Sequence, residues 1–428
     1  MNRDLAFLVS PSLGIIDNWL PVICEIARRQ PDRRICLIIP RPQSVEELST
    51  SSALVRIADG VVDSVIWKSL SGDWVQSQGI MATLSAIRSQ GAVALRARQS
   101  WNRLKAKVVG HKTWHEEKFL TNSIDLIYDV YEEDKNFTKD FIRSVRAQNA
   151  YSLHHGINVI DGGRSPKSLP GFEARNSKLQ PLTFLFSEME KPYYMETYGL
   201  MEDRIRVVGI PRHDPPWIER LQDEDRATLD DLPPRFIGLI SRPQNAKYLP
   251  IERKIKSLEA LRDVAGELGI PIVLKKHPKL KDKVEEQQLD DGIYAKVFGK
   301  ENEGKTWYDT KAHWLALGSR CVFAMSLYSG VVTDMAALGV PTVEWLDLRD
   351  LPWSDNATSL READGTPVLS YRYLGLVAGA SSKEELRRFA RNSVDRREET
   401  VAPMIERYRA AFGDPSGAIG RVADAISG

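Results

Sequence analysis

The chain has 428 residues, which at roughly 150 residues per domain predicts two large domains. Hydrophobic residues make up 42% and charged residues 27%, ordinary proportions for a globular protein that exclude a disordered chain. The 59 basic and 58 acidic residues leave a net charge of +1, which excludes a globally basic nucleic-acid binder. Three widely separated cysteines predict no disulfide framework, and no apolar run approaches the roughly 20 residues that span a bilayer. We therefore expect a cytoplasmic protein.

The first half of the chain alternates short apolar runs with amphipathic stretches. Strands are predicted at residues 4–9, 35–40, 61–67, 124–130, 182–186 and 205–208, and helices at 18–29 and from about residue 45. Strand–helix alternation at this spacing indicates βαβ units, and hence a mostly parallel sheet with helices on both faces.

An acidic, proline-terminated stretch at 221–234 interrupts the alternation and predicts a domain boundary. Strands are then predicted at 235–241, 271–275, 321–325 and 342–345, helices at 252–268 and 331–338, and only helix after residue 383. The predicted fold class is α/β, with two doubly wound, Rossmann-like domains facing a central cleft. We expect a first domain over 1–215, a second over 216–385, and terminal helices over 386–428 that pack back toward the first.

Two candidate general bases follow strands of the first half, at the edge where such sheets bind ligands. His155 lies beside His154 in a glycine-rich loop, and its imidazole would take a proton from a hydroxyl nucleophile. Asp129 ends the strand predicted at 124–130 and is the second candidate. The alternatives are histidines that make only local hydrogen bonds, and a solvated acidic loop around Asp129.

A basic loop follows the strand predicted at 271–275. Lys275, Lys276 and His277 bring cationic side chains together, which suits a phosphate or another anion. A solvated basic turn is the alternative.

A turn of small residues follows the strand predicted at 321–325 and opens the next helix. Free amide groups and serine hydroxyls at such a helix start suit a phosphate, and an aspartate one turn into the helix suits a ribose or sugar hydroxyl. A plain helix N-cap is the alternative. The residues concerned are Ser326, Tyr328, Ser329, Gly330 and Asp334.

Two further segments leave alternatives open. Arg212, in the Gly-Ile-Pro-Arg-His-Asp turn before the linker, either reaches into the cleft or belongs to a domain-boundary turn. The stretch Arg96–Lys112 has six Lys or Arg residues, one Trp and no acid, so it either contacts anionic lipid at the membrane surface or a polyanionic acceptor, or forms a solvated helix face.

Several ligand-binding motifs are missing from the sequence. There is no P-loop motif and no dinucleotide-binding glycine motif after the first strand. No Asp-x-Asp pair follows a strand to hold a divalent cation under a diphosphate. We therefore expect neither a metal nor a cofactor.

The order of these elements resembles the GT-B transferases of bacterial surface polymers, especially the CDP-glycerol glycerophosphotransferase family of teichoic-acid and capsule synthesis. The elements are a His-Gly loop, a Gly-x-Pro-Arg-x-Asp turn, a Lys-x-His-Pro loop and a Tyr-Ser turn followed by Asp and Gly-x-Pro, within about residues 120–345. The Lys-x-His-Pro loop is also similar to loops of capsule and lipopolysaccharide transferases that use CMP-linked Kdo or sialic acid.

The resemblance places the family's catalytic histidine on His155 and its His-Pro histidine on His277. It places the arginine of the turn on Arg212, and the helix-opening serine and following aspartate on Ser329 and Asp334. The sequence departs from the family pattern at three places: Ile157-Asn158 follow the His-Gly pair, Leu327 stands where the family has Asp, and Gly330 replaces a second Ser.

The resemblance implies a transferase that moves a glycosyl or glycerol-phosphate group by direct, metal-independent displacement. The donor would be nucleotide-activated, CMP-, CDP- or UDP-linked and preferably cytidine-linked, and the acceptor a surface polysaccharide or glycolipid rather than nucleic acid. The donor would bind the second domain near Ser241, Arg242, the basic loop and the small-residue turn. The alternatives are a UDP-sugar 2-epimerase of GT-B fold and a catalytically degenerate binding subunit, which Leu327 favours.

Overall fold

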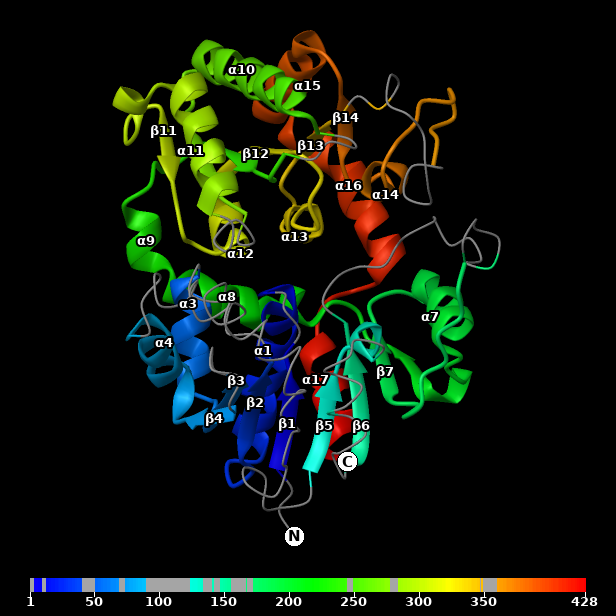
Figure 1. The fold of residues 1–428 in the computed structure, drawn as a ribbon. Helices are drawn as coiled ribbons and strands as arrows, with labels where there is room; N and C mark the ends of the chain where they lie inside the picture. Colours follow the sequence, from blue (N-terminus) through cyan, green and yellow to red (C-terminus); the bar gives the residue numbers. More distant parts are fainter. Residues whose placement is uncertain are drawn as a thin grey trace, which may run out of the picture.

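The computed structural model describes residues 4–9, 13–40, 51–68, 74–89, 124–133, 141, 147–154, 167, 172–244, 249–277, 284–346, 348 and 360–428. Within these ranges each half of the chain forms one β-sheet, and helices cover both sheets (Figure 1). The predicted α/β class with two doubly wound sheets is confirmed.

The first sheet has the strand order β4-β3-β2-β1-β5-β6-β7-β8. Neighbouring strands pair in parallel, except that β4 is antiparallel to β3 at the sheet edge. The central strand β2 reads Ile-Cys-Leu-Ile-Ile and is buried throughout, as a parallel strand covered on both faces requires. The strands are β1 (Asp4–Leu8), β2 (Ile35–Ile39), β3 (Ser64–Lys68), β4 (Trp74–Ser77), β5 (Ile124–Tyr128), β6 (Ala147–Leu153), β7 (Leu182–Leu185) and β8 (Ile205–Val207).

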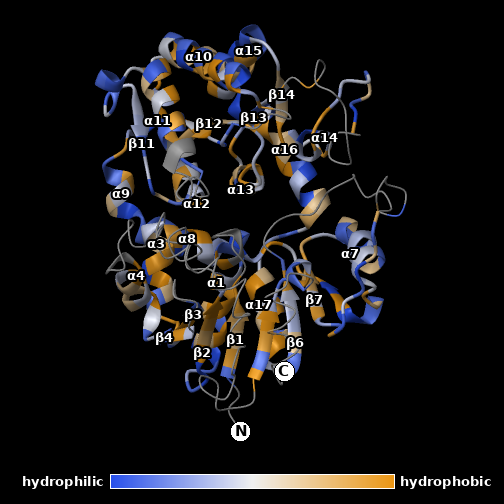
Figure 2. Ribbon diagram, viewed as in Figure 1, coloured by the Kyte–Doolittle hydropathy of each residue, from blue (hydrophilic) through white to orange (hydrophobic). Residues whose placement is uncertain are grey.

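Helices from both ends of the chain cover one face of this sheet. Apolar residues of α1 pack against Phe7, Leu37 and Phe184 of the strands, and α17 joins the same core (Figure 2). The opposite face carries the tyrosines of α7. The helices of this half are α1 (Leu13–Arg29), α3 (Ser52–Asp59), α4 (Gly79–Ser89) and α7 (Lys191–Tyr198), with α8 (Pro215–Glu224) and α9 (Arg226–Asp230) leading to the second sheet.

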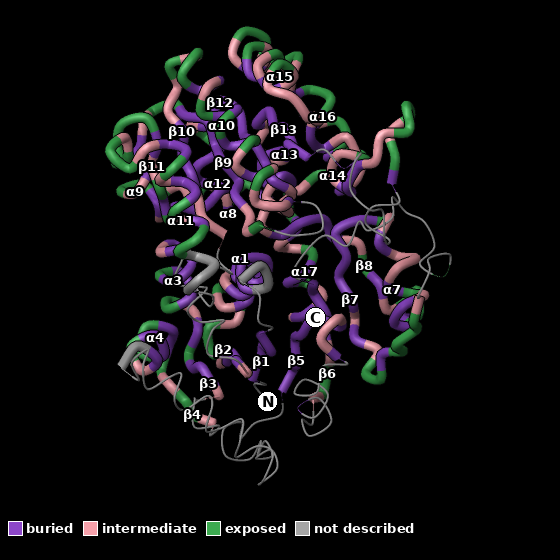
Figure 3. The backbone as a smooth tube through the Cα atoms, turned by 45° about the horizontal axis from the view of Figure 1, so that its top comes forward, coloured by how far each residue is buried: buried purple, intermediate pink, exposed green. Residues whose placement is uncertain are grey.

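The second sheet is parallel throughout and has the order β11-β10-β9-β12-β13-β14. Its central strands β9, β10, β12 and β13 are buried (Figure 3). Helices α10, α11 and α15 cover one face, and α12 and α13 cover the other. The strands are β9 (Phe236–Ile240), β10 (Ile272–Lys275), β11 (Trp307–Asp309), β12 (Cys321–Ser326), β13 (Thr342–Trp345) and β14 (Ala378–Ala380). The helices are α10 (Ile251–Leu268), α11 (Val284–Phe298), α12 (Trp314–Leu317), α13 (Val332–Ala337) and α14 (Ser370–Tyr373).

The last three helices connect the two halves. Helix α15 (Lys383–Asp395) packs on α10 of the second sheet, and α16 (Arg397–Phe412) packs on α13. Helix α17 (Ala418–Ser427) returns to the first half and packs on α1 (Figure 1). The domain limits at 215 and 385 stay predictions.

Several elements were not predicted. Strand β6 begins Ala-Gln-Asn, with exposed polar side chains in place of an apolar run, and β11 and β14 have three residues each. The supposed linker at 221–234 holds the end of α8 and all of α9, and Leu221 and Leu229 of these helices are buried. The stretch is thus largely helical and lies between the last strand of the first sheet and the first strand of the second, and its role as a domain boundary stays a prediction.

Candidate functional site

The second sheet has a topological switch point between β9 and β12, where the strand order reverses. Open α/β sheets bind ligands at such a point, beyond the carboxyl ends of the strands. Four neighbouring strands end there in register: Lys275 of β10 pairs with Ile240 of β9, which pairs with Ser326 of β12, which pairs with Glu344 of β13. These residues form a row across the sheet edge, called the strand-end row below.

The side chains of the strand-end row share one face of the sheet. Residues two positions earlier, such as Val273 and Ala324, belong to the core under α12 and α13. Because side chains alternate along a strand, Lys275 and Ser326 project to that same face. Helix α8, whose Trp217 and Leu221 belong to the core of the first sheet, packs on α12 at this side of the second sheet. The row therefore lies close to the junction of the two halves (Figure 1).

Lys275 supplies the cation of the row. Its Nζ donates a hydrogen bond to the carbonyl oxygen of Ala312 at 2.7 Å. Burial lowers the pKa of Lys275 to about 8, although the carboxylates of Asp225, Asp17 and Asp334 oppose the shift. The amine is thus mostly protonated at neutral pH and loses its charge in mild alkali.

Arg242, immediately after β9, clamps the turn that follows β12. Its Nη1 donates to the carbonyl oxygen of Tyr328 at 2.7 Å, and its guanidinium lies 5.0 Å from the centre of the Tyr328 ring. Buried Lys254 donates to the Arg242 carbonyl at 2.8 Å and also binds Asp290. The backbone at the switch point is therefore fixed from within the core.

Ser241 is tied to the same internal network. Its side chain is buried, and its hydroxyl bonds to the phenol of Tyr294. Tyr294 in turn donates to Asp290 at 3.0 Å. Ser241 thus has a protein partner and supports the position of Arg242.

The turn after β12 has a strained residue and a short helix. Tyr328 has φ +71°, in the left-handed region that non-glycine residues rarely adopt. The Ser329 hydroxyl accepts from the amide of Val331 at 3.4 Å, and α13 has only six residues. Its cap position is Val331, without a side-chain cap, so the alternative of a plain N-cap at Ser329 is not what the structure shows.

Arg212 and Asp334 meet at the junction of the two halves. Arg212 Nη2 lies 2.7 Å from Asp334 Oδ1, and Arg212 Nη1 lies 2.8 Å from Asp17 Oδ2. Burial opposes the charge on Arg212, but the two carboxylates outweigh it and raise its pKa. Both residues were predicted to contact the donor; in the structure they bind each other.

Two histidines complete this junction cluster. His213 Nε2 lies 2.7 Å from Asp334 Oδ1 and its Nδ1 lies 2.7 Å from the Tyr408 hydroxyl. Burial lowers the pKa of His213, so a neutral ring donates to Asp334 and accepts from Tyr408. His313 Nε2 lies 3.0 Å from Asp17 Oδ1, which adds a second link between the halves.

The turn that carries Arg212 also holds the C-terminal helix. The two Asp214 carboxylate oxygens accept from the amides of Gly417 and Ile419, at 3.2 and 3.1 Å. Arg421 donates twice to the carbonyl of Val208. The Gly-x-Pro-Arg-x-Asp turn is therefore where α1, α13, α16 and α17 are joined.

Other predicted site residues are placed apart from the row. Lys276 projects to the opposite face from Lys275 and pairs with Asp291 and Asp309, at 2.9 and 2.8 Å. Asp129 is buried, and its Oδ1 accepts from the Tyr131 amide at the start of a 3-10 turn.

The structure describes only part of the two loops in which histidines were predicted to act. His277 is half-buried directly beyond β10, whereas His155 and the stretch 96–112 lie outside the described residues. His154 is buried against Phe186, with Nε2 3.4 Å from Glu190 Oε1.

Glu344 is the row residue that the sequence did not reveal. It sits in a short buried strand, Thr-Val-Glu-Trp, and is 1% exposed. Burial raises the pKa of its carboxyl to about 7, although Arg372 and Arg242 oppose the shift. The sequence did contain a signal for Glu344, because it is a charged residue inside the apolar run that follows Gly-x-Pro. His213 and His313 carried no such signal, because their partners are distant in sequence.

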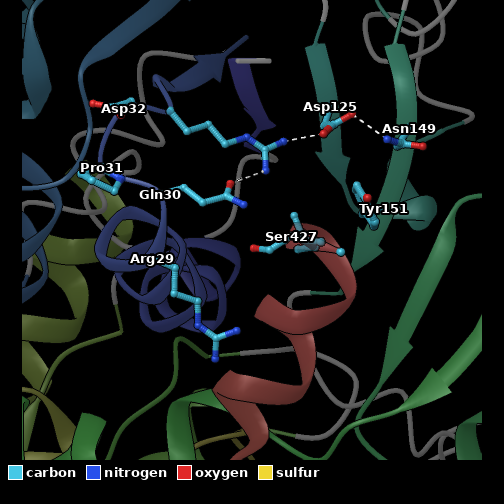
Figure 4. Close-up of a pocket in the computed structure, with 11 residues that line it drawn as sticks. Arg29, Gln30, Pro31, Asp32, Asp125, Asn149, Tyr151 and Ser427 are labelled. Atoms are coloured by element: carbon cyan, nitrogen blue, oxygen red, sulfur yellow. Dashed lines mark hydrogen bonds and ion pairs between the residues drawn. The ribbon is translucent and has the colours of Figure 1, made fainter. Parts of the chain in front are cut away.

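A hollow of about 450 Å³ lies at the amino-terminal ends of the strands of the first sheet, lined by residues 29–33, Asp125, Asn149, Tyr151 and 426–428 (Figure 4). Its polar groups bond one another: Arg33 binds Asp125 and Gln30, and Asn149 donates to Asp125 at 2.9 Å. This is the amino-terminal edge of the strands, where doubly wound sheets do not bind their ligands. We therefore place no site there.

The described part of the chain has neither a membrane-spanning helix nor a cluster of metal ligands. No helix there is both long and apolar enough to cross a bilayer. Over the same residues, no group of three or more His, Cys, Asp or Glu side chains is arranged to hold a metal ion.

Solved structures share this fold across nearly the whole chain. The wall teichoic acid polymerase TagF has a TM-score of 0.55 at 11% identity, covering 100% of this chain and 88% of TagF. A protein described as a UDP-N-acetylglucosamine 2-epimerase from Listeria monocytogenes has a TM-score of 0.52 at 12% identity, covering 100% and 96%. No protein-family model and no curated protein matches the sequence. At these identities the likeness establishes the GT-B fold alone.

Proposed function

We propose that the chain is a GT-B transferase that passes a glycosyl or glycerol-phosphate group from a nucleotide-activated donor to a surface polysaccharide or glycolipid. The observation that carries the proposal is the strand-end row: cationic Lys275 ends β10, and Arg242 follows β9, the neighbouring strand at the switch point. Cationic side chains in that position would bind a nucleotide phosphate. Cytidine-linked donors are preferred, because a structure of TagF soaked with CDPG shares the fold at a TM-score of 0.55 and 13% identity.

The proposed chemistry is a single displacement. His155 takes the proton from the acceptor hydroxyl, whose oxygen then attacks the donor carbon or phosphorus. The bond to the nucleotide phosphate breaks, and its electron pair leaves with the phosphate oxygen. Lys275 and His277 stabilise that departing negative charge. Asp129, whose Oδ1 caps a turn, is the second candidate for this base.

The two adjacent lysines allow a matched test of the donor site. Lys275→Met is expected to weaken nucleotide binding about tenfold, as the loss of one charge-assisted contact does. Lys276→Met is expected to change it little, because Lys276 faces Asp291 and Asp309. Saturation-transfer NMR and calorimetry with CMP, CDP, UDP, GDP and ADP measure both. Equal losses in the two variants would refute the placement of the site.

Turnover tests the catalytic part of the proposal. His155→Ala should abolish transfer without changing nucleotide affinity, whereas His277→Ala should weaken both. Normal transfer in either variant removes that histidine from the mechanism.

Two alternatives make different predictions. A binding-only subunit is favoured by buried Leu327 in place of the family aspartate, and by the pairing of Arg212 with Asp334. Nucleotide binding without transfer would support it. Interconversion of UDP-GlcNAc would support the epimerase alternative.

A further inference from the structure

Two buried polar side-chain atoms at the end of the second sheet have no hydrogen-bond partner among the described residues. Within the described part of the chain, neither Ser326 Oγ nor Glu344 Oε2 has one. Their residues are 0% and 1% exposed, pair directly across β12 and β13, and project to the same face. A buried carboxyl oxygen without a hydrogen bond destabilises a fold, so its presence calls for an explanation such as a ligand.

The nearby arginines have other partners. Arg372 makes two hydrogen bonds to Glu362, at 2.7 and 3.0 Å. Arg242 donates to the carbonyl of Tyr328 and lies over its ring. Both guanidinium groups act on Glu344 electrostatically, but neither is hydrogen-bonded to it in the structure. The carboxyl is therefore available to accept hydrogen bonds from a ligand.

Two aromatic rings lie beside this acid–hydroxyl pair. The Tyr328 and Tyr371 rings are 5.7 Å apart, and the Tyr371 phenol interacts electrostatically with Glu344. The backbone of Tyr328 is held in the strained left-handed region. Such strain persists where surrounding structure imposes it, often at ligand sites. Aromatic faces with a carboxyl and a hydroxyl suit a polyhydroxylated group, whose C–H faces contact the rings.

The strand-end row also has a polarity. Lys275 stands at its β10 end and Glu344 at its β13 end, three strand spacings away, or about 14 Å at ~4.8 Å per spacing. A phosphate is attracted to the lysine end and repelled by a carboxylate at the other. The uncharged, hydroxyl-bearing part of a donor fits the acidic end.

Resting on the proposed function, we propose that Ser326 and Glu344 form a subsite for the hydroxyl groups of the transferred sugar or alditol. Glu344 accepts from these hydroxyls and Ser326 donates to or accepts from them. The nucleotide and its phosphates lie toward Lys275 and Arg242. Glu344 thereby selects the transferred group, and not the nucleotide.

Calorimetry on the full chain with matched ligand pairs tests this assignment. The pairs are CMP with CMP-sialic acid, CDP with CDP-glycerol, and UDP with UDP-GlcNAc. Glu344→Gln and Ser326→Ala should each weaken binding of the complete donor about tenfold and leave the bare nucleotide within about twofold. The control is Thr342→Val: Thr342 lies on the same strand and face, but its hydroxyl already donates to the Val340 carbonyl at 3.0 Å. It should change neither affinity.

Each outcome decides a different point. Equal loss for donor and nucleotide, or no loss for either, overturns the subsite and leaves the proposed function standing. No binding by the wild-type chain in any pair overturns both. Thermal unfolding checks each variant, and since both replaced groups are unpartnered, neither substitution should lower the melting temperature. If Glu344→Gln nevertheless fails to fold, Ser326→Ala decides alone.

Discussion

Replacing Glu344 by glutamine should change how the stability of the fold depends on pH. Burial raises the pKa of this carboxyl from 4.5 to about 7 in the folded chain. Between those values the folded state keeps a proton that the unfolded state has lost, so the free energy of unfolding falls as pH rises. A difference of about 2.5 pKa units corresponds to about 3 kcal/mol. The glutamine variant has no such titration.

Urea unfolding of both proteins at pH 4.5 and pH 8 measures the effect. The wild type should lose about 3 kcal/mol relative to Glu344→Gln over this range. The charged and titratable groups that face Glu344 are Arg242, Arg372 and Tyr371, and burial raises the pKa of the Tyr371 phenol further above its usual range. Glu362→Gln, which alters the half-buried partner of Arg372, serves as control and should show no comparable shift. A difference that does not vary with pH would mean that Glu344 is ionised and paired in the fold.

Three further outcomes follow from described contacts. Asp334→Ala leaves the buried Arg212 with one carboxylate fewer and should lower the free energy of unfolding by about 3 kcal/mol in a urea titration. The control is Asp424→Ala, which removes an exposed ion pair and should lower the free energy of unfolding by less than about 1 kcal/mol. Gly209→Ala, at φ +78°, should destabilise the folded chain by about 1 kcal/mol or more. Gly266→Ala lies inside α10 with open space around it and should stabilise the folded chain by about 0.5–1 kcal/mol. Thermal unfolding measures both. Nucleotide affinity should fall as pH rises through about 8, where Lys275 loses its proton, and Lys275→Arg should remove that dependence in calorimetry between pH 7 and 9.

The architecture could be predicted because apolar runs and amphipathic stretches are local signals. The strand Thr342–Trp345 was located to the residue, and the end of β10 to Lys275. Strands without an apolar run, such as β6, were missed, because their burial depends on neighbours in the sheet. Local pattern therefore sufficed for most strands, but not for β6, which lies between β5 and β7, nor for the short edge strands β11 and β14.

The site was only partly predictable, because its contacts join distant parts of the sequence. Alternation along β10 separates Lys275 from Lys276, although both were read as one basic loop. The pairing of Arg212 with Asp17 and Asp334 brings together three elements, and no periodicity within any of them reveals it. Which polar residue faces a ligand and which faces another residue depends on tertiary structure.

The return of α17 to α1 has a consequence for biosynthesis. Val422, Ala423 and Ile426 complete the core that α1 shares with the first sheet. The ribosome delivers these residues only after the entire second sheet has been translated. Until α17 has been made, part of the apolar face of α1 stays exposed on the nascent chain. Exposed apolar surface of this kind is what chaperones bind. Final folding of the first half is thus coupled to completion of the second, and a polypeptide truncated before α17 leaves this part of α1 without its packing partner.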